Sequence, residues 1–414
     1  MFQKYQKTFR EFPARFWVLV LATFIDMIGG TMIFPFFALY ITQKFDVGMT
    51  QAGVLLAMFS FSGLIGGMLG GALTDKFGRK GMVLFGLVVS ALSSLTMGFV
   101  SQFYVFYPLV IFVGLLSSVG HPAQQAMVAD LLPEEKRTEG FGILRVAANL
   151  AWIIGPTIGG FVASRSYLAL FITDAVLSLI TAAIVLRMLP ETKPEAVGEK
   201  AQESFLKTLS GYRQVIADRL YMAFLLASIL MLIVYQQMYN TLSVYLRDVH
   251  GVPAQGYGFM LTSSAITVVL LQFWVTRRTK NYPPLLMMAL GGAFYVVGFS
   301  MFGFVAAYFL FVTAVVLITF GEMIVVPIGQ SLAASFAPAD MRGRYMAFFG
   351  LSWALPSTIG PWAAGLIMDN YDPRWVWYLG GIIATLSVLA FLWLYAATRQ
   401  RFAVLQESPS PAAD

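Results

Sequence analysis

Apolar stretches long enough to cross a bilayer recur along the whole chain, with short polar loops between them. A membrane-spanning helix needs about 20 apolar residues, whereas β-barrel spans are shorter and alternate polar with apolar positions. The pattern therefore predicts twelve transmembrane helices. They are expected at residues 15–41, 52–74, 81–100, 103–131, 138–164, 167–188, 219–246, 256–276, 283–302, 305–335, 341–368 and 375–397.

Composition indicates that lipid, not water, surrounds most of this chain. Of its 414 residues, 58% are hydrophobic and 12% are charged, against about 25% charged in an average soluble domain. Cysteine is absent and only two histidines occur, which excludes disulfides and thiolate metal sites. We therefore expect an all-α membrane protein with no metal and no cofactor.

The placement of basic residues predicts the orientation in the membrane. Short cytoplasmic loops collect Lys and Arg. With the N-terminus inside, the outer loops hold only Lys44, Arg165, Arg247 and Arg374 of the 27 Lys and Arg residues. Both termini are therefore predicted to be cytoplasmic, in the inner membrane of a bacterium. The net charge of +6 is then an orientation signal, and we expect no nucleic-acid partner.

A polar segment and an internal repeat divide the chain in two. We expect a six-helix bundle at 1–190, a cytoplasmic linker at 191–217, a second bundle at 218–400 and a tail at 401–414. The stretch that begins at Pro122 matches the one at Pro327, a shift of 205 residues. The same shift places Gly155-Pro156 on Gly360-Pro361 and Gly160 on Gly365. Parallel six-span repeats are a known transporter plan, with the substrate bound between the halves.

Two glycine-rich elements resemble motifs of one transporter family. The loop GALTDKFGRKG resembles the signature between spans 2 and 3 of the major facilitator superfamily, and its matching residues are Gly71, Asp75, Gly78, Arg79 and Lys80. The element GPTIGG resembles the span 5 motif of the twelve-helix drug:proton antiporters, with Gly155, Pro156, Gly159 and Gly160. The branch often has an Arg in span 4, where this chain has Val110. The resemblance implies the major facilitator fold, with two pseudo-symmetric six-helix bundles.

The loop is expected to act as a conformational gate on the cytoplasmic side. Gly71 and Gly78 permit a tight turn, and an anionic Asp75 can lie at the positive end of a helix in the other half. Arg79 can pair with Asp130 at the end of span 4, while Lys80 adds positive charge. A turn whose basic residues only set the orientation would leave the same pattern.

The span 5 element is expected to shape helix packing. Pro156 removes a backbone donor and should kink the helix, while the glycines form a smooth face. In the family, this packing seals the outer route against leakage during antiport. Simple close packing of small residues is the alternative interpretation.

Ionisable residues inside predicted spans are the candidates for proton coupling, because such residues are costly in a membrane. Burial disfavours the charged form of a carboxyl, which allows proton loading and release. Glu322 in span 10 is the first candidate and Asp26 in span 1 the second. Arg145 in span 5 is either a static ion-pair partner or the group that expels the proton. Asp174 in span 6 and His121 beside Pro122 are further candidates, each with a structural alternative.

The resemblance implies that spans 1, 4, 7 and 10 line the cavity, and spans 1 and 7, together with span 5, offer aromatic and amide side chains for a substrate. The candidates are Tyr235, Gln236, Tyr239, Asn240, Asn149, Trp152, Phe34 and Tyr40. An aromatic, Met-rich wall with few charges suits bulky amphipathic molecules. Lipid-facing aromatic belts require similar residues.

These features together predict a proton-coupled secondary active transporter that exports drug-like amphipathic molecules by alternating access. Its partners are the substrate, protons and the lipid bilayer, and one chain suffices to form the cavity, so a monomer is expected. A lipid or glycolipid flippase, a transporter of a specific metabolite, and a membrane receptor or scaffold are the alternatives. No GxxxxGK[ST] loop for ATP occurs, and no constellation of catalytic residues suggests an enzyme.

Overall fold

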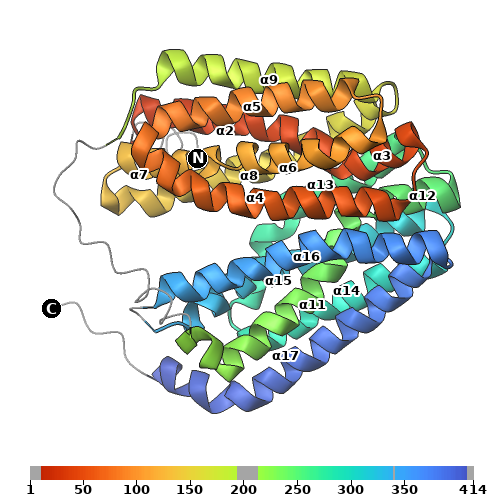
Figure 1. The fold of residues 1–414 in the computed structure, drawn as a ribbon. Helices are drawn as coiled ribbons and strands as arrows, with labels where there is room; N and C mark the ends of the chain where they lie inside the picture. Colours follow the sequence, from red (N-terminus) through yellow and green to blue (C-terminus); the bar gives the residue numbers. More distant parts are fainter. Residues whose placement is uncertain (1–10, 194–212, 339–340, 408–414) are drawn as a thin grey trace. The chain divides into compact units, whose positions relative to one another are not determined.

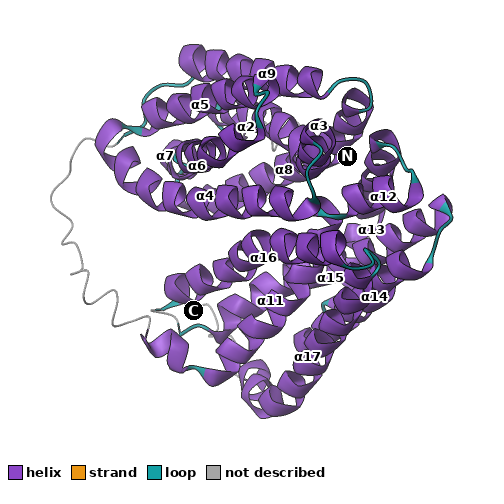
Figure 2. Cartoon of the chain, turned by 45° about the vertical axis from the view of Figure 1, so that its right-hand side comes forward, coloured by secondary structure: helices purple, strands orange, loops and turns teal. Residues whose placement is uncertain are grey.

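The chain is helical throughout its described parts. The computed structural model describes residues 11–193, 213–338 and 341–407, in which no strand occurs (Figures 1 and 2). The helices of the first six expected spans are α2 (Ala14–Ile33), η1 (Phe34–Phe36), α3 (Phe37–Phe45), α4 (Met49–Phe77), α5 (Arg79–Phe99), η2 (Phe103–Val105), α6 (Phe106–Ser117), α7 (Gly120–Leu131), α8 (Glu134–Ala163) and α9 (Tyr167–Met188). The remaining helices are α11 (Arg219–Asn240), α12 (Leu242–His250), α13 (Ala254–Thr279), α14 (Pro284–Phe304), α15 (Tyr308–Phe336), α16 (Arg342–Asn370) and α17 (Trp375–Glu407). The prediction of an all-α membrane protein is confirmed.

The expected spans reappear in the predicted order. Among the described residues, eleven helical segments are long and apolar enough to cross a membrane. The twelfth expected span, 341–368, forms α16, whose 29 residues exceed the about 20 that a bilayer requires. Its proline, serine, threonine and glycine residues make α16 less apolar than the other spans.

Three of the expected spans are interrupted. In span 1, η1 separates α2 from α3 at Pro35, because proline has no backbone N–H to continue the α-helical ladder. In span 4, α6 ends and α7 begins just before Pro122. In span 7, α11 gives way to α12 at Thr241. By contrast, α8 runs without interruption through Pro156.

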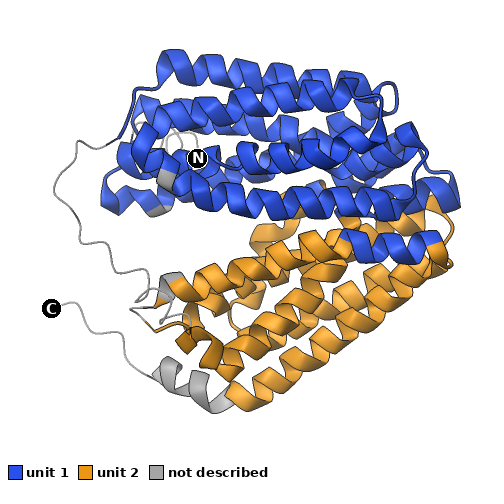
Figure 3. Cartoon of the chain, in the orientation of Figure 1, with its two compact units in different colours: residues 1–200, 239–265, 361–369 blue, residues 201–238, 266–360, 370–414 orange. Residues whose placement is uncertain are grey.

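Two compact units make up the molecule (Figure 3). Unit 1 contains residues 1–200, 239–265 and 361–369, and unit 2 contains residues 201–238, 266–360 and 370–414. Unit 1 thus combines the first six spans with α12, the first half of α13 and the end of α16. The predicted division into bundles 1–190 and 218–400 stays a prediction, and residues 194–212 of the linker lie outside the described residues.

Glycines bring the helices of unit 1 into close contact. The α4 and α6 helices pack side by side, and a Cβ atom on Gly66 or Gly70 would overlap the backbone of Leu115 or Val119. Backbones approach closely in lipid where small residues line the helix interface. Buried aromatic and aliphatic side chains, among them Phe16 and Met127, fill the space between α2, α5, α7 and α9.

In unit 2, α14 packs against both α15 and α17. A Cβ atom on Gly321 would lie 2.6 Å from the Gly291 carbonyl oxygen, so these glycines set the spacing of α14 and α15. A small apolar core that contains Met287, Met323 and Ile324 lies beside this contact. The segment of α15 that carries Glu322 is therefore held by backbone contact on one side.

Candidate functional site

The predicted gate loop forms a tight turn between α4 and α5. Gly78, at φ +92°, ends α4 in a backbone conformation that favours glycine. The next residue, Arg79, places its Nε 3.1 Å from Asp130 Oδ2 and its Nη1 3.4 Å from Asp75 Oδ1. The contact between Arg79 and Asp130 is the one expected from the sequence. Asp75 itself is 78% exposed, and the gating role of this cluster stays a prediction.

A carboxylate that the sequence analysis did not select holds this turn together. Glu191, just after α9, accepts hydrogen bonds from the backbone N–H groups of Arg79 (2.8 Å) and Lys80 (3.1 Å). It also accepts from the N–H groups of Thr192 and Lys193, both at 2.9 Å. Partial burial opposes its charge, but the four donors outweigh this effect and lower the pKa of Glu191.

Two carboxyl groups, the buried Asp174 and the half-buried Asp26, lie between α2, α5 and α9. Asp174 is 4% exposed and accepts a hydrogen bond from Ser94. One turn along α9, Ser178 donates to Asp26 Oδ1 at 3.2 Å and lies 3.5 Å from Ser90. Gly29 admits the Asp174 carboxyl, which occupies the space of a Cβ atom. The structure thus brings Asp26 and Asp174 into one oxygen-rich cluster.

Glu322 lies in unit 2 among apolar neighbours. Its Oε2 atom is buried and has no hydrogen-bond partner, while Tyr235 of α11 hydrogen-bonds its carboxyl group. Tyr235 is 5% exposed, stacks on Tyr295 at 5.7 Å and meets Trp353 edge-on at 6.2 Å. A charged carboxylate in this setting lacks the full set of donors that it needs. The site is therefore suited to a carboxyl group that gains and loses a proton.

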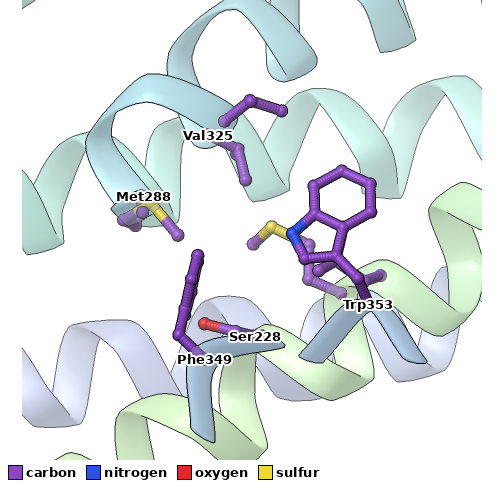
Figure 4. A pocket seen from close by; sticks show the side chains of 9 residues that line it. Ser228, Met288, Val325, Phe349 and Trp353 are labelled. Atoms are coloured by element: carbon purple, nitrogen blue, oxygen red, sulfur yellow. The ribbon is translucent and has the colours of Figure 1, made fainter. Parts of the chain in front are cut away.

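An apolar pocket lies one turn from these residues in unit 2 (Figure 4). It is a small, partly open pocket between α11, α14, α15 and α16. The side chains of Met288, Val325, Phe349 and Trp353 face it. Ser228 also lines the pocket, but its hydroxyl group donates to the Phe224 carbonyl at 2.9 Å. The pocket accordingly offers apolar contact and almost no free polar group.

The polar candidates on α7 and α8 are exposed in unit 1. Arg145 and Asn149 lie one turn apart on α8, and both side chains are exposed. His121, at the start of α7, is also exposed. Charged and amide groups at membrane depth face water-filled space rather than lipid. These three residues are therefore suited to line an aqueous path, while their predicted roles in proton coupling and substrate binding stay predictions.

The structure brings some of the aromatic candidates together and separates others. Trp152 meets Phe34 at 6.0 Å and Tyr239 at 5.3 Å, both edge-on. Tyr40 is 2% exposed and donates to the Met97 carbonyl at 2.7 Å, inside the packed core of unit 1. Asn240 is also buried and Gln236 half-buried.

The span 5 element packs against α2 and α13 within unit 1. A Cβ atom on Gly155 would overlap Thr31, and one on Gly159 would lie 2.5 Å from the Met32 carbonyl oxygen. Gly160 faces Gly258 of α13, where the added atom would lie 2.9 Å from the Gly258 Cα. The smooth face expected from the glycines is therefore present, while its sealing role stays a prediction.

Sequence reasoning missed several partners of the candidate residues. Ser94 and Ser178 look like ordinary small residues of a packed helix, and only their position opposite the carboxyl groups distinguishes them. Trp353 has no charge or motif to mark it. Glu191 could have been noticed, since it follows Pro190 where the apolar residues of span 6 give way to the polar linker.

Comparison with known proteins agrees with this arrangement of spans. The model of the Major Facilitator Superfamily matches residues 19–361 and, in a second match, residues 258–413. This chain belongs to the Major Facilitator Superfamily. It is therefore a multi-pass membrane transporter and not an enzyme.

Relatives of this superfamily member span nearly its whole length. A Na(+), Li(+), K(+)/H(+) antiporter of Planococcus maritimus is 26% identical over 391 residues, which cover 88% of this chain and 92% of the relative. The multidrug resistance protein MdtH of Shigella dysenteriae serotype 1 is 25% identical, over 92% of this chain and 94% of the relative. The crystal structure of the nucleoside transporter NupG has the same fold, with a TM-score of 0.79 at 13% identity over 92% of this chain and 99% of that one.

Proposed function

We propose that this transporter is a proton-coupled exporter of amphipathic small molecules that works by alternating access. Glu322 carries the proposal, because its buried Oε2 atom has no hydrogen-bond partner in an apolar span. An ionisable group inside a membrane span is a functional candidate by default, because its charged form is unfavourable there. The apolar pocket one turn away supports an amphipathic substrate, since it accepts an apolar group and offers few hydrogen bonds.

The transport cycle follows from the cost of burying charge. A proton from the periplasm neutralises Glu322, and the substrate leaves outward while the carboxyl group is neutral. The neutral form is the one that an apolar site tolerates, so the transporter reorients in this form. Release of the proton into the cytoplasm restores the charged site for the next substrate. Asp26 and Asp174 serve as a second proton-binding group, and exposed Arg145 favours proton release from nearby carboxyl groups.

The relatives support both parts of the proposal. The Planococcus maritimus relative is named as an antiporter that exchanges cations for H(+), which supports proton coupling. The Shigella dysenteriae relative is named as a multidrug resistance protein, which supports a drug-like substrate. Localisation in a bacterial inner membrane with both termini inside is part of the same proposal.

Exchange of monovalent cations for protons is a second candidate function. The cluster of Asp26, Asp174 and their serine partners consists of hard oxygen ligands, the type that alkali cations bind. The antiporter from Planococcus maritimus acts on such cations. Under this function the cations, not an amphipathic molecule, exchange for the protons.

Purified protein in proteoliposomes with an imposed pH gradient tests the proposal. We expect a lipophilic cationic dye to move in the direction opposite to the protons in wild type and in Glu139→Gln, which alters an exposed carboxyl group on α8. Glu322→Gln should reduce gradient-driven movement by at least tenfold, because it removes the titrating group. Asp26→Asn should have an effect in the same direction but smaller.

Each alternative has its own outcome in this assay. Equal dye movement in wild type and Glu322→Gln means that the proton carrier is assigned wrongly. No dye movement in wild type, together with Na⁺-driven proton movement that Asp26→Asn abolishes, favours cation exchange. If neither dye nor Na⁺ moves, the proposed substrate class is wrong.

A further inference from the structure

Two helix contacts in unit 1 are copies of each other under the internal repeat. A Cβ atom on Gly258 of α13 would lie 3.1 Å from the Pro156 carbonyl oxygen of α8. A Cβ atom on Gly53 of α4 would lie 2.5 Å from the Pro361 carbonyl oxygen of α16. The shift of 205 residues converts Gly53 into Gly258 and Pro156 into Pro361. The α8–α13 contact and the α4–α16 contact therefore form a symmetry-related pair of seams.

The two seams are held by different side-chain hydrogen bonds. Asp369, at the end of α16, accepts hydrogen bonds from the backbone N–H groups of Met49 (2.9 Å) and Thr50 (2.8 Å) at the start of α4. The repeat equivalent of Asp369 is Ser164, which donates to the Phe161 carbonyl of its own helix. A Thr157–Thr262 hydrogen bond of 2.7 Å links the α8–α13 seam instead. Only the α4–α16 seam is held by a carboxylate.

Asp369 supplies a cap that α4 cannot provide for itself. The N-cap residue of α4 is Gly48, which has no side chain to accept from the first N–H groups. A Cβ atom at Gly48 would lie 2.7 Å from the Asp369 Cγ, so glycine there admits the carboxylate. An anion at a helix N-terminus is stabilised by the aligned peptide dipoles. Asp369 also stands at the C-terminal end of its own helix, where a negative charge is unfavourable.

From this arrangement we infer that Asp369 is a positioning residue of the transport cycle, a latch that keeps the α4–α16 seam closed. The α4–α16 seam lies at the Met49 end of α4. The turn at Gly78 lies at the other, predicted cytoplasmic end, so the seam is on the predicted periplasmic side. Opening toward the periplasm separates α16 from α4 and leaves the carboxylate at the unfavourable end of its own helix. The α8–α13 seam, held by glycine contact and a neutral hydrogen bond, opens more easily. This inference rests on the proposed alternating access.

Spin labels on this chain measure the latch directly. The sequence has no cysteine. Spin labels on Gln51→Cys of α4 and Leu366→Cys of α16, both at exposed positions, are therefore the only two labels, and the distance between them reports on the seam. We expect Asp369→Asn to shift the distance distribution in lipid nanodiscs toward separated helices, and Asp369→Ala to shift it further. Loss of a helix cap corresponds to roughly a fivefold change in the ratio of separated to closed forms.

The matched control is Asp372→Asn. Asp372 lies three residues after Asp369, and its carboxylate accepts a hydrogen bond from the Arg374 N–H. Distance distributions that stay the same in both Asp369 variants would overturn the latch, as would an equal shift in the control. Distances need no substrate, so this outcome is independent of dye transport. A chain that moves no dye but still shows the Asp369 shift would contradict the proposed substrate class and leave the latch intact.

Discussion

At the scale of single residues, carboxylates hold this molecule together by accepting from backbone N–H groups. Glu191 does so at the start of α5 and Asp369 at the start of α4. Each replaces a cap that the helix itself lacks, since Gly78 and Gly48 are the N-cap residues. Charge-assisted hydrogen bonds to N–H groups are stronger than neutral ones, so each carboxylate helps to fix the chain beside a predicted gate.

Replacement of Glu191 tests the first of these contacts. Because its native pKa lies below the ordinary value of 4.5, its contribution to stability is complete above about pH 4.5. It is lost as the pH falls through the lowered native pKa. We expect Glu191→Gln to reduce the apparent Tm at pH 7 by a small amount, since solvent screens this exposed charge.

A thermal-unfolding series in detergent at several pH values measures this effect. The difference between wild type and Glu191→Gln should shrink as the solution is acidified below about pH 4.5. Glu139→Gln, at an exposed position on α8, serves as the control. A difference that persists unchanged in acid would mean that the carboxylate charge is not what matters.

At the scale of helices, the side of the helix on which each glycine lies decides which helices touch. Gly66 and Gly67 are neighbours on α4, but only Gly66 faces the Leu115 backbone, while no atom lies within 4 Å of a Cβ atom on Gly67. Both residues belong to the same glycine-rich stretch of sequence. Composition therefore predicts close packing in this span, and geometry decides where it occurs.

Adjacent alanine substitutions test this difference. Gly66→Ala forces α4 away from α6 and should cost about 1–3 kcal/mol, as overpacking does. Gly67→Ala meets open space and should be neutral or slightly stabilising, because alanine favours helix. Apparent Tm values in detergent compare the two variants. Equal losses of Tm in both would contradict the helix spacing described for unit 1.

At the scale of the whole molecule, the internal repeat and the basic loops set the plan of the transporter. The repeat explains why α8 and α16 both carry a Gly-Pro pair and why two similar seams occur in unit 1. The two repeats depart from symmetry at the carboxyl groups. Glu322 and the cluster of Asp26 and Asp174 occupy different positions in the two repeats, so each half carries different carboxyl groups.

Thiol labelling in intact cells tests the predicted orientation. The absence of cysteine allows single cysteines at exposed loop positions, Ser101 between α5 and η2 and Asn281 between α13 and α14. A membrane-impermeant maleimide added outside should label Ser101→Cys and leave Asn281→Cys unlabelled until the cells are opened. The reverse pattern would invert the topology and move the Asp369 seam to the cytoplasmic side.

Much of the architecture followed from the sequence alone, because a bilayer imposes strong and local rules. Span length and the positions of basic loops depend on neighbouring residues only. The pairing of Arg79 with Asp130 was predicted because the topology puts the loop and the end of span 4 on the same side of the membrane. Ionisable residues inside spans were also visible, since Glu322, Asp26 and Asp174 interrupt apolar runs.

Only the tertiary structure decided which side chains meet. A helix exposes every side chain in turn, so the sequence selected Tyr40 as a cavity residue from its span alone and could not show which way it points. Packing placed Asp26 beside Ser178 of α9 and buried Tyr40 in a core of aromatic rings. The caps formed by Glu191 and Asp369 join residues 112 and 320 positions apart. Such contacts depend on how helices cross in space, and no local pattern of residues encodes that crossing.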